Sequence, residues 1–286
     1  MGKFYDEIPD FLIKWIKQQK MFWVATAPLS PTGHVNVSPK GYGHTFHVID
    51  QHRVWYEDLT GSGVETISHL RENGRITILF SAFEGPPRIV RLFGTGTVHE
   101  FGTPEYNELI PREKRSVGSR SVIVVDVHKV GTSCGFSIPF YAYKSDRMLL
   151  NKIAAQKELV DVKVESAALA SCDDEPDSEK LPLSDDGLKD YWKNHNAKSI
   201  DGLPGLLGSF LSRNIFNEAA ASKDWGKDDV TVSTKMKMKA KAKASIWGAG
   251  GVAQVVDLKV FAGFVLGVVT TGLWINFAAL LRAKVL

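Results

Sequence analysis

Between residues 22 and 128 the sequence is a succession of short strand-like runs separated by turn residues. Pro28, the tetrapeptide 30–33 (Ser-Pro-Thr-Gly) and the pair Asp50-Gln51 separate the first of these runs. Because open antiparallel sheets expose unpaired edges, such a series favours closure into a barrel. The pattern predicts an antiparallel β-barrel with strands at 22–27, 34–38, 45–49, 53–56, 75–81, 88–93 continuing towards His99, and 121–128.

Two stretches change to the spacing of a helix. Residues 8–19 place apolar side chains on one helix face, and residues 63–73 repeat them three apart, at Val64, Ile67 and Leu70. Asn73-Gly74 supplies a C-terminal stop for the second helix. The sequence therefore predicts a mainly β fold with one helix before the barrel and one within it.

The succession of strand-like runs ends before about residue 150, and the composition changes after it, so we place the barrel domain at 1–150. Residues 171–186 carry seven acidic residues against one lysine, together with two prolines, which is typical of a loop. Ordered-looking sequence returns around Trp192, and a Lys-, Ala- and Gly-rich stretch follows. The domain organisation that we predict is an extension at 151–208 containing an acidic loop at 171–186, and a linker at 209–259.

The stretch 260–281 contains 22 residues without a charge. At about 1.5 Å per helical residue it reaches about 33 Å, enough for a hydrocarbon core of about 30 Å. The segment 235–243 upstream carries five lysines, and this excess of positive charge on the N-terminal side favours a cytosolic N-terminal domain. We therefore expect a single-pass C-terminal transmembrane helix that attaches the protein to a membrane. The alternative is a buried C-terminal helix, which Thr270, Thr271 and Asn276 would allow.

Composition narrows the function classes. A hydrophobic fraction of 44% is ordinary for a globular protein, and a net charge of +3 gives no reason to expect nucleic acid as a partner. His44 and His47 are the closest histidine pair, but they fall on opposite faces of a predicted strand, so we predict no metal site. No Ser-His-Asp or paired-carboxylate signature is visible, and the catalytic residues stay unknown.

Three separate stretches offer groups that bind phosphate. In the first, Lys40 ends a predicted strand beside Gly41, so its ammonium group is expected to project beyond the sheet edge towards an anion. The alternative is a solvated lysine in a turn.

The second stretch is Thr60-Gly61-Ser62-Gly63, directly before the predicted helix. Backbone N–H groups at a helix N-terminus form an anion site, and both hydroxyls can donate hydrogen bonds. The alternative is a plain helix cap at Ser62, although a cap needs one such residue and not four.

The third stretch contains Arg88 and Arg91, which lie three apart on a predicted strand and so on opposite faces. One of them is expected to reach the ligand while the other faces solvent or a partner subunit; a cross-strand ion pair is the alternative. Trp55 and Tyr56 precede the glycine-rich stretch, where an aromatic ring is expected either to flank a flavin or to belong to the core.

The chain resembles the pyridoxamine 5′-phosphate oxidase-like family of FMN-binding split-barrel proteins, in particular its uncharacterised fungal and bacterial branch. The residues that carry the resemblance are Val37-Ser38-Pro39-Lys40-Gly41, Trp55-Tyr56 with Thr60–Gly63, and Arg88-x-x-Arg91-x-x-Gly94. The resemblance implies a split barrel that binds FMN, with a phosphate-contacting lysine at Lys40 and a phosphate loop at 60–63. It also implies a homodimer with two cofactor sites at the subunit interface, and an oxidoreductase acting on a small organic substrate through the flavin.

Two other interpretations stay open. One is a non-enzymatic flavin or haem binding protein, for which His44, His47 and His69 are the candidate axial ligands. The other is a membrane-docked barrel without a cofactor. It rests on Val35 and on Ser62-Gly63, which stand where authentic pyridoxamine phosphate oxidases place basic residues.

Overall fold

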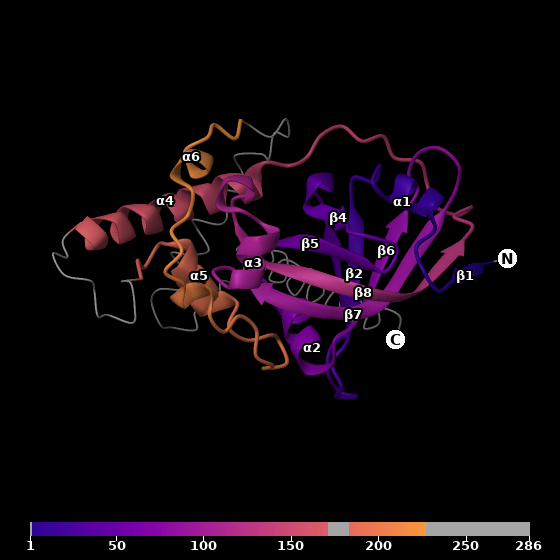
Figure 1. The fold of residues 1–286 in the computed structure, drawn as a ribbon, viewed down its shortest axis with the longest axis horizontal. Helices are drawn as coiled ribbons and strands as arrows, with labels where there is room; N and C mark the ends of the chain where they lie inside the picture. The colour runs from indigo at the N-terminus through magenta and orange to yellow at the C-terminus, as the bar shows by residue number, and fades with distance from the viewer. Residues whose placement is uncertain (1, 171–182, 227–286) are drawn as a thin grey trace, which may run out of the picture. The chain divides into compact units, whose positions relative to one another are not determined.

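The computed structural model describes residues 2–170 and 183–226 (Figure 1). Within these residues eight strands form one antiparallel sheet in the order β3-β2-β6-β7-β8-β5-β4, and β1 pairs with β8. The strands are β1 (Lys3–Tyr5), β2 (Phe22–Thr26), β3 (Asn36–Lys40), β4 (Phe46–Val48), β5 (Arg53–Leu59), β6 (Arg75–Ser81), β7 (Ile89–Glu100) and β8 (Ser119–Ser133).

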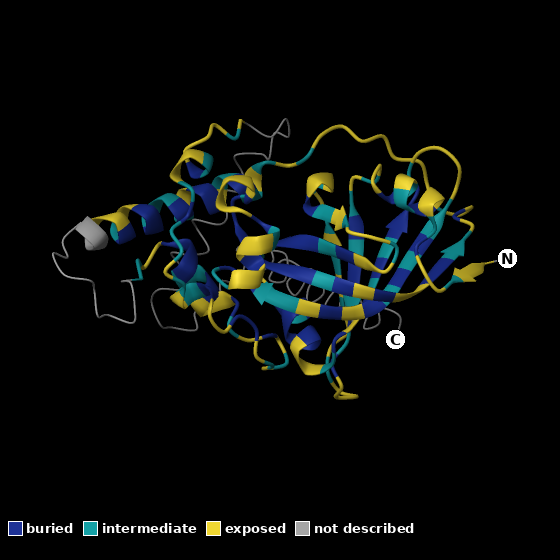
Figure 2. Cartoon of the chain, in the orientation of Figure 1, coloured by how far each residue is buried: buried dark blue, intermediate teal, exposed yellow. Residues whose placement is uncertain are grey.

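The sheet curls so that its two ends approach each other across an apolar interior. Phe46 lies on β4, at one end of the strand order, yet its ring centroid is 5.0 Å from that of Phe22 on β2 and 5.1 Å from that of Phe80 on β6. Inward residues are buried and outward residues are only partly covered, as the alternation along β2 shows (Figure 2). The architecture is a curled antiparallel half-barrel, which fits the predicted split barrel.

Helices α1 (Asp10–Ile16) and α2 (Glu65–Asn73) pack on this sheet. Leu12 and Ile16 of α1 are buried, because the apolar face recognised in the sequence faces the core. Helix α2 ends at Gly74, whose φ of +71° is the left-handed conformation that glycine adopts without strain. Both helices are therefore confirmed, with α1 shorter than the predicted 8–19.

The remaining helices lie at one end of the sheet (Figure 1). The long helix α4 was not predicted, because carboxylates share its buried side with Ala154, Ala155 and Val162 and so interrupt the apolar stripe. These helices are α3 (Pro104–Leu109), α4 (Leu149–Ala170), α5 (Leu188–His195) and α6 (Glu218–Ala221), with short 3-10 turns η1 (Gly43–Thr45), η2 (Arg112–Lys114) and η3 (Ser209–Leu211).

Residues 209–226 correct the predicted domain organisation, in which they began a linker. Phe216 is fully buried, with its ring centroid 5.0 Å from that of Phe101 and 5.7 Å from that of Trp192. Phe210 and Ile215 pack against the same core, so several apolar side chains attach this segment to the domain. The segment is therefore part of the compact unit Met1–Asp228.

Three of the sequence predictions fall wholly or partly outside the described residues. These are the acidic loop at 171–186, of which only 183–186 is described, the linker from 227 onward, and the apolar tail at 260–281. Among residues 2–170 and 183–226 there is no helix that combines the length and apolarity needed to cross a membrane.

Candidate functional site

A cavity of about 330 Å³ opens where the ends of β3 and β5 meet the start of α2. We call this place the seam of the half-barrel, because it lies where the two ends of the curled sheet approach each other. It brings together five of the nine predicted site residues: Lys40, Thr60, Gly61, Ser62 and Gly63. The cavity is also lined by residues that the sequence analysis did not single out: Tyr42, Glu57, Leu59, Glu65, Arg120 and Leu150 among them.

Asp58 links the two cations of the cavity. Its carboxylate accepts hydrogen bonds from Lys40 Nζ at 2.7 Å and from Arg120 Nε at 2.8 Å, and it is buried together with Arg120. Burial by itself would raise the pKa of Asp58, but Arg120 and Lys40 outweigh this and lower the pKa to about 2. Asp58 therefore stays ionised at any physiological pH and fixes both cations at the rim of the cavity.

The glycine-rich loop is held at Thr60 and through its carbonyl groups, since Arg120 Nη1 donates to the Gly63 carbonyl oxygen at 2.9 Å. The side chain of Ser62 takes no part in these contacts. Thr60 Oγ1 donates to the Gly118 carbonyl oxygen at 2.6 Å, and the Thr60 N–H donates to the same oxygen at 2.7 Å. Ser62 is exposed, and its hydroxyl makes no hydrogen bond within the part of the chain that the structure describes. The space around the Gly61 Cα is open.

Helix α2 begins without a side-chain cap, which overturns the alternative role considered for Ser62. The N-cap residue is Val64, and no side chain accepts from the first-turn N–H groups. Unsatisfied N–H groups at the start of a helix attract anions. The first turn of α2 therefore presents free donors at the wall of the cavity.

Two carboxylates also line the cavity, and both are engaged by the protein. Glu57 accepts from the Ser116 N–H at 2.9 Å and from the Ser116 hydroxyl at 2.6 Å. Glu65 accepts from the Ile200 N–H at 3.4 Å, and its carboxylate lies against Gly63. An anion bound at the start of α2 would consequently lie close to Glu65, and the two charges would repel each other.

The comparisons with known proteins agree with this geometry. The family model described as "Pyridoxamine 5'-phosphate oxidase" matches residues 8–134. The pyridoxamine 5′-phosphate oxidase family protein ustO of Aspergillus flavus is 37% identical over 228 residues, covering 79% of this chain and 86% of that protein. The chain belongs to the pyridoxamine 5′-phosphate oxidase family. The 228 aligned residues exceed what residues 8–134 can supply, so the likeness to the fungal protein continues beyond the matched region.

Solved structures of other proteins are similar at lower identity. HupZ of Group A Streptococcus is 22% identical, with a TM-score of 0.35, and the match covers 43% of this chain and 92% of HupZ. A FAD-binding protein of Mesorhizobium loti is 11% identical, with a TM-score of 0.32, and the match covers 46% of this chain and 96% of that protein.

In this pyridoxamine 5′-phosphate oxidase family protein, the predicted arginines do not line the cavity. Arg88 precedes β7, and its guanidinium lies over the rings of Phe11 and Trp15 at 5.8 and 5.5 Å. Arg91 lies on the outer face near the start of β7, where it donates to Ser133 Oγ at 3.4 Å. The sequence places both on a strand but cannot tell which end of the sheet meets the glycine-rich loop.

Neither predicted aromatic residue lines the cavity of this family member. Tyr56 is fully buried, and its ring centroid is 5.4 Å from that of Phe22, so it belongs to the barrel core. Trp55 points the other way along β5 and stacks on His47, with ring centroids 3.8 Å apart. The core alternative considered for this pair therefore holds for Tyr56.

The candidate haem ligands are also absent from the cavity lining. His44 and His47 are exposed, and His69 lies on the buried face of α2, where its Nδ1 is 3.0 Å from Thr26 Oγ1. Burial lowers the pKa of His69, which favours a neutral ring.

Sequence reasoning missed Asp58 and Arg120, the two residues that organise the charges of the site. A signal was present, because Asp58 interrupts an apolar strand and Arg120 directly precedes the apolar run at 122–125. Charged residues in such positions are buried only when they are paired. Their partnership was not visible, because it joins residues that are 62 positions apart.

Proposed function

We propose that the chain binds FMN in the cavity at the barrel seam and acts as an oxidoreductase on a small organic substrate. The observation that carries the proposal is the convergence of the uncapped start of α2 with two fixed cations, Lys40 and Arg120, on one cavity. Membership of the pyridoxamine 5′-phosphate oxidase family supports a flavin as the ligand.

The residues fit the phosphate end of FMN. The N–H groups at the start of α2 and the Ser62 hydroxyl would donate to the phosphate, and Lys40 and Arg120 would balance its charge. Asp58 keeps both cations in place before the ligand arrives, so that little ordering is required on binding. A cavity of about 330 Å³ is within the range for small ligands.

When bound, the flavin supplies the hydride and electron transfer. The contribution of this chain is to bind and orient it. Glu57 and Glu65 accept hydrogen bonds from Ser116 and from the Ile200 N–H, which orient both carboxylates in the lining.

Titration calorimetry of the full-length protein with FMN, and with riboflavin as the phosphate-free control, tests the proposal. We expect FMN to bind more tightly than riboflavin, and the complex to show flavin absorbance that is bleached by a reductant. A protein that stays colourless and releases no heat with either ligand would refute flavin binding.

A variant of Glu65 tests where the phosphate lies. Glu65→Gln removes the negative charge beside Gly63 while it keeps the side-chain length. We expect tighter FMN binding by roughly threefold to tenfold, from removing one like charge at close range in a high-dielectric setting, and unchanged riboflavin binding. Equal effects on the two ligands would place the phosphate away from the start of α2.

A homodimer is also part of the proposal. The cross-strand row Pro39–Trp23–Leu79–Arg91 runs over the outer face of the sheet, and Val37 in the next row is 61% exposed. A second copy on this face would cover apolar surface and would meet Arg91. Sedimentation equilibrium should give twice the chain mass, and Val37→Lys should shift the protein towards the monomer.

The last part of the proposal is a membrane attachment through 260–281, with the flavin domain in the cytosol. Its support is the uncharged sequence of that stretch and the lysines upstream. The protein should sediment with membranes and be released by detergent but not by salt; recovery in the soluble fraction would refute the attachment.

A further inference from the structure

The glycine-rich loop is held by two side chains from a region well beyond the segment that the family model matches. The indole N–H of Trp192 donates to Thr60 Oγ1 at 2.8 Å, and Asn196 Nδ2 donates to the Gly61 carbonyl oxygen at 3.0 Å. Both residues have no exposed surface. The bonded residues are 132 and 135 positions apart in the sequence, so these contacts exist only in the folded protein.

Helix α5, which carries Trp192 and leads into Asn196, is itself fixed by α4. Asp161 accepts from the N–H groups of Leu188 and Lys189 at 2.7 and 3.0 Å, which caps the start of α5. The start of α5 therefore cannot shift along α4 without breaking the two buried, charge-assisted hydrogen bonds to Asp161.

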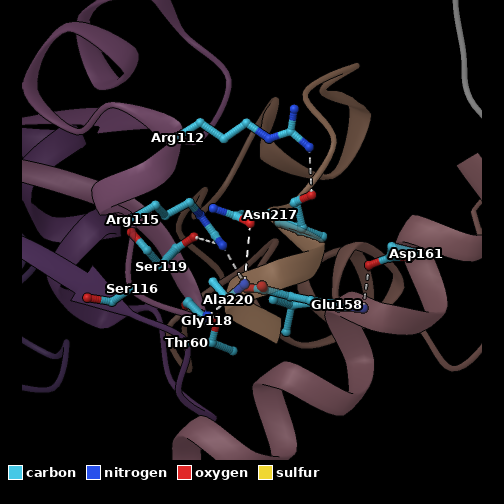
Figure 3. Close-up of polar contacts among 12 residues, drawn as sticks. Thr60, Arg112, Arg115, Ser116, Gly118, Ser119, Glu158, Asp161, Asn217 and Ala220 are labelled. Atoms are coloured by element: carbon cyan, nitrogen blue, oxygen red, sulfur yellow. Dashed lines mark hydrogen bonds and ion pairs between the residues drawn. The ribbon is translucent and has the colours of Figure 1, made fainter. Parts of the chain in front are cut away.

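Helix α4 also reaches the loop from the other side. Glu158 accepts from the Gly118 N–H at 2.7 Å, and the Gly118 carbonyl oxygen accepts from Thr60 (Figure 3). Gly118 has a φ of +82°, and a Cβ there would lie 2.9 Å from the Cβ of Ala154, so this close approach requires glycine. Two of the contacts that hold the loop therefore depend on α4, and a third comes from Arg120 of β8, which donates to the Gly63 carbonyl oxygen at 2.9 Å.

We propose that Trp192 and Asn196 are positioning residues that hold the Thr60–Gly63 loop in the conformation that binds the phosphate of FMN. The part that concerns the phosphate rests on the proposed function. Neither residue lines the cavity, so both act through the loop. The C-terminal extension is then a component of the ligand site and not only an appendage to the barrel.

The experiment compares the full-length protein with Trp192→Phe and Asn196→Leu. Trp192→Phe keeps an aromatic ring against Phe101 and Phe216 but lacks the N–H donor. Asn196→Leu removes the second hydrogen bond independently, and it tests the same inference if Trp192→Phe folds poorly. Tyr191→Phe, on the same helix and outside the loop contacts, is the matched control.

Two quantities are measured on each protein. Hydrogen exchange of the ligand-free chain reports the loop amides at 60–64, with those of β8 as the internal reference. Calorimetry gives the ratio of FMN to riboflavin affinity. We expect exchange in the loop to become about fivefold faster and the affinity ratio to fall by a similar factor, the usual consequence of one lost hydrogen bond, while β8 and Tyr191→Phe stay unchanged.

The two readouts separate this inference from the proposed function. Loop exchange that matches the wild type in both variants would overturn the inference, whatever the flavin does. Faster exchange with an unchanged ratio of affinities would overturn the role in phosphate binding. If the wild type binds no flavin, the proposed function fails and the exchange data still decide whether α5 holds the loop.

Discussion

Two buried clusters of charge lie on either side of the glycine-rich loop, and their composition is opposite. At the barrel seam one carboxylate, Asp58, is shared by Lys40 and Arg120. Along α4 three buried carboxylates face two cations: Glu158 pairs with Arg115, Glu165 pairs with Lys189, and Asp161 caps α5. The first cluster borders the cavity at the seam. In the second, the Glu158–Arg115 pair is sealed between α4 and the loop at 115–119 (Figure 3), whereas Glu165 and Lys189 border another cavity of about 340 Å³.

The pKa values follow this difference. Burial acts to raise the pKa of all four carboxyls. At Asp58 the two cations together outweigh burial and lower the pKa, whereas at Glu158, Asp161 and Glu165 burial prevails and the pKa is raised. Glu57 and Glu65 also line the cavity at the seam, so an anion there would depend on the uncapped start of α2 and on the two cations that Asp58 holds. We therefore interpret the seam as the binding site and the α4 cluster as its support.

The largest expected effect on stability comes from breaking the buried ion pair between Glu158 and Arg115. Arg115→Met should destabilise the protein by about 3–5 kcal/mol, because it leaves the Glu158 charge buried without its partner. Urea unfolding measures this, and Arg53→Met is the control, since its ion pair with Asp126 is exposed. If the two variants cost the same, the α4 cluster contributes no more than a surface pair.

The cavity cluster should respond mainly in ligand affinity. Lys40→Met should weaken FMN binding by about 1.5–3 kcal/mol, the usual value of a charged hydrogen bond, and should leave riboflavin binding unchanged. The exposed Lys14 of α1 provides the control Lys14→Met. Unchanged FMN affinity in calorimetry would mean that Lys40 serves only to neutralise Asp58.

The stability of the protein at acid pH should show the contribution of the Asp58 carboxylate. Since its folded pKa is lowered to about 2 from 3.8, its stabilisation is complete above pH 4 and disappears as pH falls through 2. The difference in unfolding free energy between wild type and Asp58→Asn should therefore narrow by about 2 kcal/mol from pH 5 towards pH 1. A constant difference across that range would show that folding does not lower the pKa of Asp58.

Asp161 should give the smallest effect, with the opposite sign of pH dependence. Its pKa is raised, so its contribution is greatest at low pH and declines as pH rises through the folded pKa. Asp161→Asn keeps an oxygen that accepts from the start of α5, so at neutral pH the stability should change by less than about 1 kcal/mol. The decline of the unfolding free energy with rising pH should be absent in Asp161→Asn. A decline of equal slope in the variant and the wild type would exclude Asp161 as its source.

Much of the barrel could be predicted from the sequence, because strands and helices depend on local periodicity. The predicted strand at 75–81 coincides with β6, and the stop at Asn73-Gly74 ends α2 as expected. Four predicted strands, those that became β2, β3, β4 and β7, are off by one or two residues at their ends, where pairing with a neighbour decides the boundary. β5 and β8 extend further than predicted, to Leu59 and Ser133. Helix α4 escaped prediction because its buried carboxylates hide the apolar period.

The candidate site divides in the same way. The amino-acid sequence by itself determined that a lysine ends one strand and that a glycine-rich loop precedes a helix, since both features are local. Only the tertiary structure decided that Lys40 meets Asp58 and Arg120, that Arg88 and Arg91 lie elsewhere, and that a distant helix holds the loop. The physical reason is that a curled sheet brings its two ends near each other, and no local pattern records which residues then face each other.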